Sequence, residues 1–113
     1  MRADCDCDLC AMQRTIGGWA RATFPNQTAG AIITHLLEEA QELDVARRAR
    51  YGSRPRVAVE AADVAILLLA LADHEGFSLH GAIATKHAVN EGRRWADPDE
   101  RGVHHHVREG HEG

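Results

Sequence analysis

The sequence predicts an all-α protein, a compact antiparallel helical bundle of about four helices. Aromatic residues make up only 4% of the chain, so the core has to be built from alanine, valine, isoleucine and leucine, which suit close helix packing. Apolar residues recur three and four positions apart in several segments, which is the spacing of one helix face. At 113 residues the chain fits one domain, whose core stays small unless it shares surface with a second copy.

The first two predicted helices lie in the N-terminal half of the chain. Residues 9–23 form the first, because the residue before Pro25 avoids helical conformations and two adjacent glycines only weaken its middle. The second begins after Thr28 or Gly30 and runs to about residue 50, with an apolar side and an acidic side. Both helices therefore have one face suited to packing.

The third predicted helix follows a Tyr-Gly-Ser-Arg-Pro turn at residues 51–55, and the fourth follows the third after Gly76. The third covers residues 56–75, and its nine consecutive apolar residues, 64–72, predict a helix enclosed on all sides. Ser78 is a credible cap for the fourth, which spans residues 79–94. The predicted organisation is a Cys-rich extension at 1–8, a helical domain at 9–95 and a polar, His-rich, loose tail at 96–113.

Charge and hydropathy exclude several classes of protein. A formal net charge of −4 argues against binding nucleic acid, which needs a basic stripe, and means that an anionic substrate needs a bridging cation. No apolar run reaches the roughly 18 residues of a membrane span, and the N-terminus lacks a signal-peptide pattern. We therefore expect a cytoplasmic protein with no membrane partner.

Cys5, Cys7 and Cys10 are too few and too crowded for a disulfide framework, so reduced thiols are expected. Thiolate and imidazole are also the ligands that Zn²⁺ prefers. The spacing matches no zinc module, but a Zn²⁺ site that draws on the histidines of the tail stays open as an alternative. Those histidines are His104, His105, His106 and His111.

Two carboxylate pairs carry the strongest chemical signal. Glu39 and Glu42 are three residues apart on the second predicted helix, and Glu60 and Asp63 have the same spacing on the third. The second pair leads directly into the apolar residues 64–72, where an unpaired charge costs several kcal/mol. A divalent metal is the simplest compensation, and oxygen ligands favour Mg²⁺ together with substrate phosphates.

Other interpretations of the carboxylates remain. Either pair taken alone could be a solvated helix face with salt bridges to arginine or lysine. A carboxylate-bridged di-iron bundle is disfavoured, because it requires Glu-x-x-His repeats that neither pair provides.

The fourth predicted helix supplies complementary groups. Lys86, Asn90 and Arg93 fall four and then three residues apart, hence on one face, and Arg94 and Trp95 follow directly. Lysine and arginine both suit phosphate oxygens. We therefore expect these residues to bind phosphates opposite the two carboxylate pairs. The alternative is salt bridging to the second helix.

Two further aromatic residues near the motifs, Trp19 and Phe24, could stack on a base or simply belong to the core.

The order of these motifs resembles the MazG-like all-α nucleotide pyrophosphohydrolases. Their signature is Glu-Glu-x-x-Glu, a spacer and Glu-x-x-Asp, which Glu38-Glu39-Ala40-Gln41-Glu42 and Glu60-Ala61-Ala62-Asp63 match. The Lys-x-x-x-Asn-x-x-Arg-x-Trp pattern that follows is matched from Lys86 to Trp95, so the resemblance covers residues 19–107. The Cys-rich start, the His-rich end and the short spacer of seventeen residues depart from it.

This resemblance implies an enzyme that hydrolyses a nucleoside triphosphate between its α and β phosphates, giving a monophosphate and pyrophosphate. The active site would lie between paired helices and be completed in a homodimer or homotetramer. The implied cofactor is Mg²⁺, with Mn²⁺ able to substitute. The implied metal ligands are Glu39, Glu42, Glu60 and Asp63.

The resemblance also implies residue roles and a substrate. Glu38, Glu39 and Lys86 would be catalytic, with Glu38 a further ligand or the group that orients water. Short stand-alone members of the family occur in phages and act on deoxynucleotide pools, so a purine such as dGTP is the expected substrate, and a phosphoribosyl-ATP substrate has to be excluded by assay. The rival hypothesis is a non-enzymatic helical dimer or a zinc-binding interaction module. The implied substrate-binding residues are Lys86, Asn90 and Arg93. From its place one turn before Glu39, His35 is a further candidate to contact a phosphate or the sugar, with a structural hydrogen bond as the alternative. Trp95 is a candidate to stack on the base, with a core position as the alternative.

Overall fold

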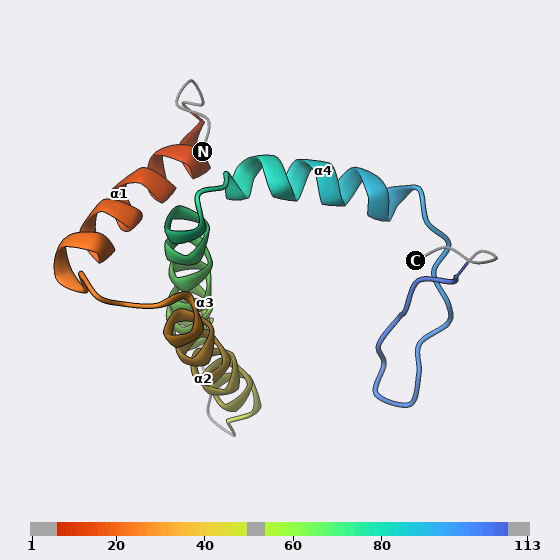
Figure 1. Ribbon diagram of the computed structural model, residues 1–113. Helices are drawn as coiled ribbons and strands as arrows, with labels where there is room; N and C mark the ends of the chain where they lie inside the picture. Colours follow the sequence, from red (N-terminus) through yellow and green to blue (C-terminus); the bar gives the residue numbers. More distant parts are fainter. Residues whose placement is uncertain (1–6, 50–53, 109–113) are drawn as a thin grey trace. The chain divides into compact units, whose positions relative to one another are not determined.

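The computed structural model describes residues 7–49 and 54–108 and confirms the all-α prediction (Figure 1). The described residues form four helices and no strand beyond one isolated bridge. Residues 51–53 of the predicted turn at 51–55, together with Cys5 and His111, lie outside the described residues. None of the four helices has the length and hydropathy that crossing a bilayer requires. The helices are α1 Asp8–Thr23, α2 Ala29–Arg48, α3 Arg54–Glu75 and α4 Leu79–Glu91.

Side-chain caps fix the starts of three helices. Thr28 Oγ1 accepts a hydrogen bond from the Ala31 N–H at 3.1 Å at the start of α2, as the sequence predicts. Ser78 Oγ caps α4 in the same way, accepting from the Gly81 N–H at 3.1 Å. The cap of α1 is unusual, because the acceptor is the sulfur of Cys7.

The chain divides into two compact units, Met1–Gly81 and Ala82–Gly113. In the first unit, α3 packs against both α2 and α1 (Figure 1). Small and medium side chains fill these contacts, as expected for a chain with few aromatic residues. The buried apolar residues are Cys10, Ile32, Ala46, Leu69, Ala70 and Ala72.

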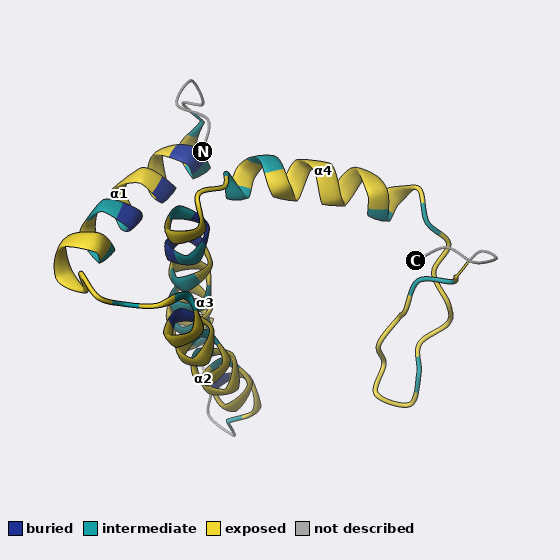
Figure 2. Cartoon of the chain, in the orientation of Figure 1, coloured by how far each residue is buried: buried dark blue, intermediate teal, exposed yellow. Residues whose placement is uncertain are grey.

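The prediction that α3 is enclosed on all sides is wrong for the single chain. Ile66 is 38% exposed and Leu68 36% exposed, although both belong to the apolar run 64–72 (Figure 2). Within the first unit only α1 and α2 pack on α3, so part of its apolar circumference faces outward. Exposed apolar side chains of this kind on a packed helix are typical of a surface that contacts another molecule.

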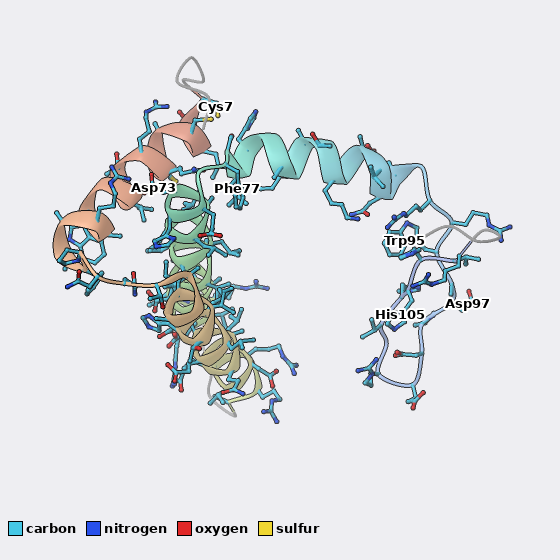
Figure 3. All side chains as sticks on the ribbon, viewed as in Figure 1. Cys7, Asp73, Phe77, Trp95, Asp97 and His105 are labelled. Atoms are coloured by element: carbon cyan, nitrogen blue, oxygen red, sulfur yellow. The ribbon has the colours of Figure 1, made fainter. Side chains whose placement is uncertain are left out.

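Gly17 marks the close approach of α1 to α3. A Cβ atom at Gly17 would lie 2.6 Å from Asp73 Cβ, which is far inside van der Waals contact. Asp73 also forms an ion pair with Arg21, one turn further along α1, and its side chain is 7% exposed (Figure 3). The glycine that weakens the isolated helix is therefore what allows α1 and α3 to pack.

Gly17→Ala is expected to destabilise the protein by about 1–3 kcal/mol, because the overlap with Asp73 outweighs the gain of about 1 kcal/mol in helix propensity. Gly18→Ala is the matched control. The nearest atom to a Cβ there is the guanidinium nitrogen of Arg21, 3.8 Å away, so this variant should be as stable as the parent chain or more so. Urea unfolding followed by circular dichroism measures both, and two changes of the same sign would contradict the packing described.

The second unit begins in α4 and continues into an ordered loop, so the prediction of a loose tail is wrong for residues 96–108. The helix ends at Glu91 rather than at residue 94, and the chain then pairs with itself. The Ala96 N–H donates to His105 O and the Val107 N–H to Arg94 O, each at 2.8 Å. These bonds flank the bridge between Trp95 and His106, whose rings meet edge to face.

Asp99 organises the turn of this loop. Its Oδ1 accepts hydrogen bonds from the Arg101 N–H at 2.8 Å and the Val103 N–H at 3.0 Å. Hydrogen bonding, above all from the backbone of Val103 and from the Arg101 side chain, lowers the pKa of Asp99 to about 2. The folded loop thus favours the ionised carboxylate.

The loop should therefore stay ordered to low pH. Because the folded pKa lies below the ordinary value of 3.8, the contribution of Asp99 is fully present above that value and is lost as the pH falls through about 2. We expect the NMR amide shifts of Arg101 and Val103 to titrate with a midpoint near pH 2. A midpoint near pH 4 would show that these hydrogen bonds do not form in solution.

Candidate metal site and adjoining pocket

Three carboxylates from two helices meet in the first unit. Glu39 comes from α2, and Glu60 and Asp63 come from successive turns of α3. One oxygen atom from each lies within 4.8 Å of the others, and all three residues are half-buried. The packing of α2 on α3 brings together residues that are more than twenty positions apart in the sequence.

The chemistry of this cluster fits a hard divalent cation. Three ionised carboxylates at this spacing repel one another unless a positive charge lies between them. Their donors are oxygen atoms only, and partial exposure leaves room for the waters that Mg²⁺ and Mn²⁺ retain. His35, one turn before Glu39, places Nε2 3.2 Å from Glu39 Oε1 and so restrains that carboxylate.

Glu38 and Glu42 lie differently from the other three acidic residues. Both are exposed on α2, and neither belongs to the group whose oxygen atoms converge. Their roles as water-orienting group and metal ligand remain predictions. Three of the four predicted metal ligands are thus brought together within one chain, and Glu42 is not among them.

A cavity of about 590 Å³ opens beside the carboxylate cluster. Glu39 and Asp63 form part of its wall, so the cavity and the cluster are continuous. The rest of the wall is mostly apolar and comes from α1, the α1–α2 connection and α3, with His35 of α2 as a further polar member. Its main apolar contributors are Ile16, Trp19, Phe24, Ile66, Leu67 and Ala70.

Two aromatic rings shape one side of this cavity. Trp19 and Phe24 meet edge to face with their ring centroids 5.4 Å apart and their planes at 89°. They are 57% and 44% exposed, so neither is a core residue, and a planar ligand can reach both. The structure therefore favours the stacking interpretation of these residues over the core interpretation.

The cavity wall also contains a residue that the sequence did not single out. Gln27 lies in the connection between α1 and α2 and is half-buried. His74 Nε2 lies 3.1 Å from its backbone oxygen, which ties the connection to α3. Because a glutamine in a loop belongs to no motif, only the fold could identify it.

The predicted phosphate-binding residues lie in the second unit. Lys86 and Asn90 are on α4, whereas Arg93 follows the end of the helix, so the three do not share one continuous helix face as predicted. Trp95 Nε1 donates a hydrogen bond to Asn90 O at 2.9 Å, which uses its polar group within the unit. Substrate binding by these four residues remains a prediction.

Comparison with known proteins identifies relatives of the chain. A family model described as dATP/dGTP pyrophosphohydrolase matches residues 12–113. A dATP/dGTP diphosphohydrolase of Salmonella phage PMBT28 is 42% identical over 99 residues, 88% of this chain but only 31% of that protein. A dATP/dGTP diphosphohydrolase of cyanophage S-2L is 36% identical over 94 residues, 83% of this chain and 84% of that protein.

A solved structure supports the same relationship. It is the MazG-like pyrophosphohydrolase of cyanophage S-2L bound to dGDP and three catalytic Mn²⁺ ions per active site. The similarity has a TM-score of 0.75 at 32% sequence identity and covers 92% of this chain and 97% of that one.

Proposed function

The chain belongs to the dATP/dGTP pyrophosphohydrolase family, and we propose that it hydrolyses purine deoxynucleoside triphosphates between the α and β phosphates with the help of divalent metal ions. Membership confirms the resemblance to MazG-like enzymes that the motifs indicate. The observation that carries the proposal is the convergence of Glu39, Glu60 and Asp63 at the edge of a cavity with aromatic walls. The carboxylate cluster suits metal ions and phosphates, and the adjoining cavity suits a base.

We assign the metal ions to the carboxylate cluster. Mg²⁺ is the expected ion and Mn²⁺ a functional substitute, in line with the Mn²⁺ ions of the S-2L enzyme. Bound there, the ions would polarise the phosphoryl group, activate water and neutralise the leaving group. Because several ions need more oxygen ligands than the three clustered residues offer, the exposed Glu38 and Glu42 are the candidates for additional ligands.

The chain's own residues would position the substrate. The edges of Trp19 and Phe24 provide an apolar surface for the base, and Gln27 offers both a donor and an acceptor to its polar edge. His35 holds Glu39, so its proposed role is to orient that carboxylate. Lys86, Asn90 and Arg93 are proposed to bind the phosphates, with Lys86 stabilising the charge that develops in the reaction.

The proposed reaction needs no covalent intermediate. A water oxygen attacks the α phosphorus and the bond from that phosphorus to the α–β bridging oxygen breaks. The electron pair of the broken bond leaves with pyrophosphate, and the water loses a proton to a nearby carboxylate. Glu38 and Glu39 are the candidates for that acceptor, because Glu39 belongs to the carboxylate cluster and Glu38 is its neighbour on α2.

We also propose that the active form is a homodimer or homotetramer in the cytoplasm, where nucleotides are available. The apolar side chains that α2 and α3 leave exposed support a self-contact. Leu37 is 61% exposed and Val59 60% exposed, each on a helix that also contributes to the carboxylate cluster. Burying such side chains gives roughly 25 cal/mol per Å² of apolar surface, which favours association.

A substrate panel tests the proposed function. The four deoxynucleoside triphosphates, ATP, GTP and phosphoribosyl-ATP are incubated with Mg²⁺ or Mn²⁺, and the products are separated by ion-exchange chromatography. We expect dGTP and dATP to give the monophosphate and pyrophosphate fastest, with activity lost in EDTA and restored by added Mn²⁺. Release of orthophosphate would show β–γ cleavage, and absence of turnover on every nucleotide would favour a non-enzymatic helical dimer.

A further inference from the structure

We propose a Zn²⁺ site formed by Cys7, Cys10 and His80, separate from the carboxylate cluster. The two sulfur atoms and one imidazole nitrogen lie within 4.8 Å of one another. Ligand atoms around a tetrahedral zinc ion are roughly 3.5–3.8 Å apart, given Zn–S of about 2.3 Å and Zn–N of about 2.0 Å. Small side-chain rotations therefore close the group on a metal ion, and thiolate with imidazole is the donor set that zinc prefers over Mg²⁺.

The two cysteines have the local geometry of a zinc-binding pair. Cys7 caps α1, and Cys10 follows three residues later in the first turn, so both side chains lie on the same side of the helix. The Cys10 N–H donates to Cys7 Sγ at 3.3 Å. Cys10 is 2% exposed, whereas His80 is exposed, so a metal ion can enter from the histidine side.

A buried glutamine fixes the position of His80. Gln13 lies one turn after Cys10 and is 1% exposed. Its Nε2 donates to Phe77 O at 2.7 Å and its Oε1 accepts from the Leu79 N–H at 2.9 Å, on the segment that connects α3 to α4 (Figure 3). His80 follows immediately, so two partly buried hydrogen bonds hold it beside the cysteines without help from a metal.

The proposed site uses His80 in place of the tail histidines that the sequence suggested as zinc ligands. His104 and His105 lie in the loop of the second unit, where their rings contact Ala96 O at 2.7 Å and Asp99 Oδ2 at 3.2 Å. The expectation of three reduced thiols is also wrong for this structure, since Cys10 is disulfide-bonded, whereas Cys7 is not in a disulfide. A disulfide and zinc compete for the same sulfur, so the proposed site binds metal in the reduced chain.

Metal binding to the reduced full chain tests the proposal. Protein reduced with a phosphine and freed of metal is titrated with Co²⁺ and then Zn²⁺, and bound zinc is counted by mass spectrometry. We expect one ion per chain, a thiolate-to-cobalt charge-transfer band and an affinity that falls by about tenfold or more in Cys7→Ser and in His80→Asn. His87→Asn is the control, because His87 lies two turns further along α4 and is 69% exposed.

Two further measurements distinguish zinc bound at Cys7, Cys10 and His80 from metal bound at the carboxylate cluster. Glu60→Gln should leave zinc stoichiometry and the cobalt spectrum unchanged, and excess Mg²⁺ should not displace the ion. Circular dichroism confirms that each variant is folded. A reduced parent chain that binds well under one zinc ion, or a folded His80→Asn variant that binds as tightly as the parent, would overturn the proposal.

Discussion

Asp63→Asn is expected to lower the kcat of dGTP hydrolysis by about a thousandfold while the chain stays folded. The substitution keeps the size of the side chain but removes one of the three negative charges that we assign to the metal ions. It also removes a carboxylate from the cavity wall, at the point where phosphates and base would meet. Steady-state assays at saturating Mn²⁺, with circular dichroism as the folding check, measure the effect.

Asp44→Asn makes the same chemical change outside the cluster. Asp44 lies on α2, five residues after Glu39, and its 50% exposed side chain pairs with Arg47 and Arg48 at 3.0 Å each. Exposed pairs of this kind contribute little to stability, so this variant should keep its activity within about twofold. Equal losses of activity in the two variants, or full activity in Asp63→Asn, would show that catalysis does not depend on the carboxylate cluster.

Trp19→Ala is expected to raise the KM for dGTP about tenfold with a smaller change in kcat. Stacking of a base on an aromatic side chain contributes roughly 1–3 kcal/mol, and a tenfold change corresponds to about 1.4 kcal/mol. Trp19 suits this role because it lines the cavity, is 57% exposed and is held at an angle of 89° to Phe24. Initial-rate measurements over a range of dGTP and dATP concentrations give both constants.

Met12→Ala provides the control for the tryptophan. Met12 lies two turns earlier on α1 and is 55% exposed, but it is not part of the cavity wall. Its truncation removes a comparable exposed apolar side chain without touching the proposed base site. If Trp19→Ala leaves the KM for both purine nucleotides unchanged, the cavity does not bind the base.

Local signals were sufficient to predict the helices. Ser78 caps α4 where the sequence placed it, and Thr28, one of the two starts that the sequence allowed, caps α2, because a cap depends on neighbours three residues away. The pairing of Glu60 with Asp63 also follows from spacing along one helix. The approach of Glu39 to that pair was predicted from the motif, and α2 packing on α3 realises it.

Long-range contacts were not predictable from local pattern. Gly17 lets α1 approach α3, and nothing near Gly17 in the sequence indicates that it faces Asp73. His80 approaches the cysteines only through the hydrogen bonds of Gln13 to residues more than sixty positions away. The enclosure predicted for the apolar run 64–72 failed in another way, since a hydrophobic pattern does not say whether its residues are buried within the chain or by a second molecule.

Binding of Mn²⁺ in the presence of dGMP, followed by electron paramagnetic resonance, addresses the carboxylate cluster without relying on turnover. The parent chain should bind Mn²⁺ stoichiometrically, and a folded Asp63→Asn variant should bind it at least about tenfold more weakly while Asp44→Asn binds as the parent does. Equal Mn²⁺ affinity in the parent chain and in Asp63→Asn would contradict a metal site built by Glu39, Glu60 and Asp63.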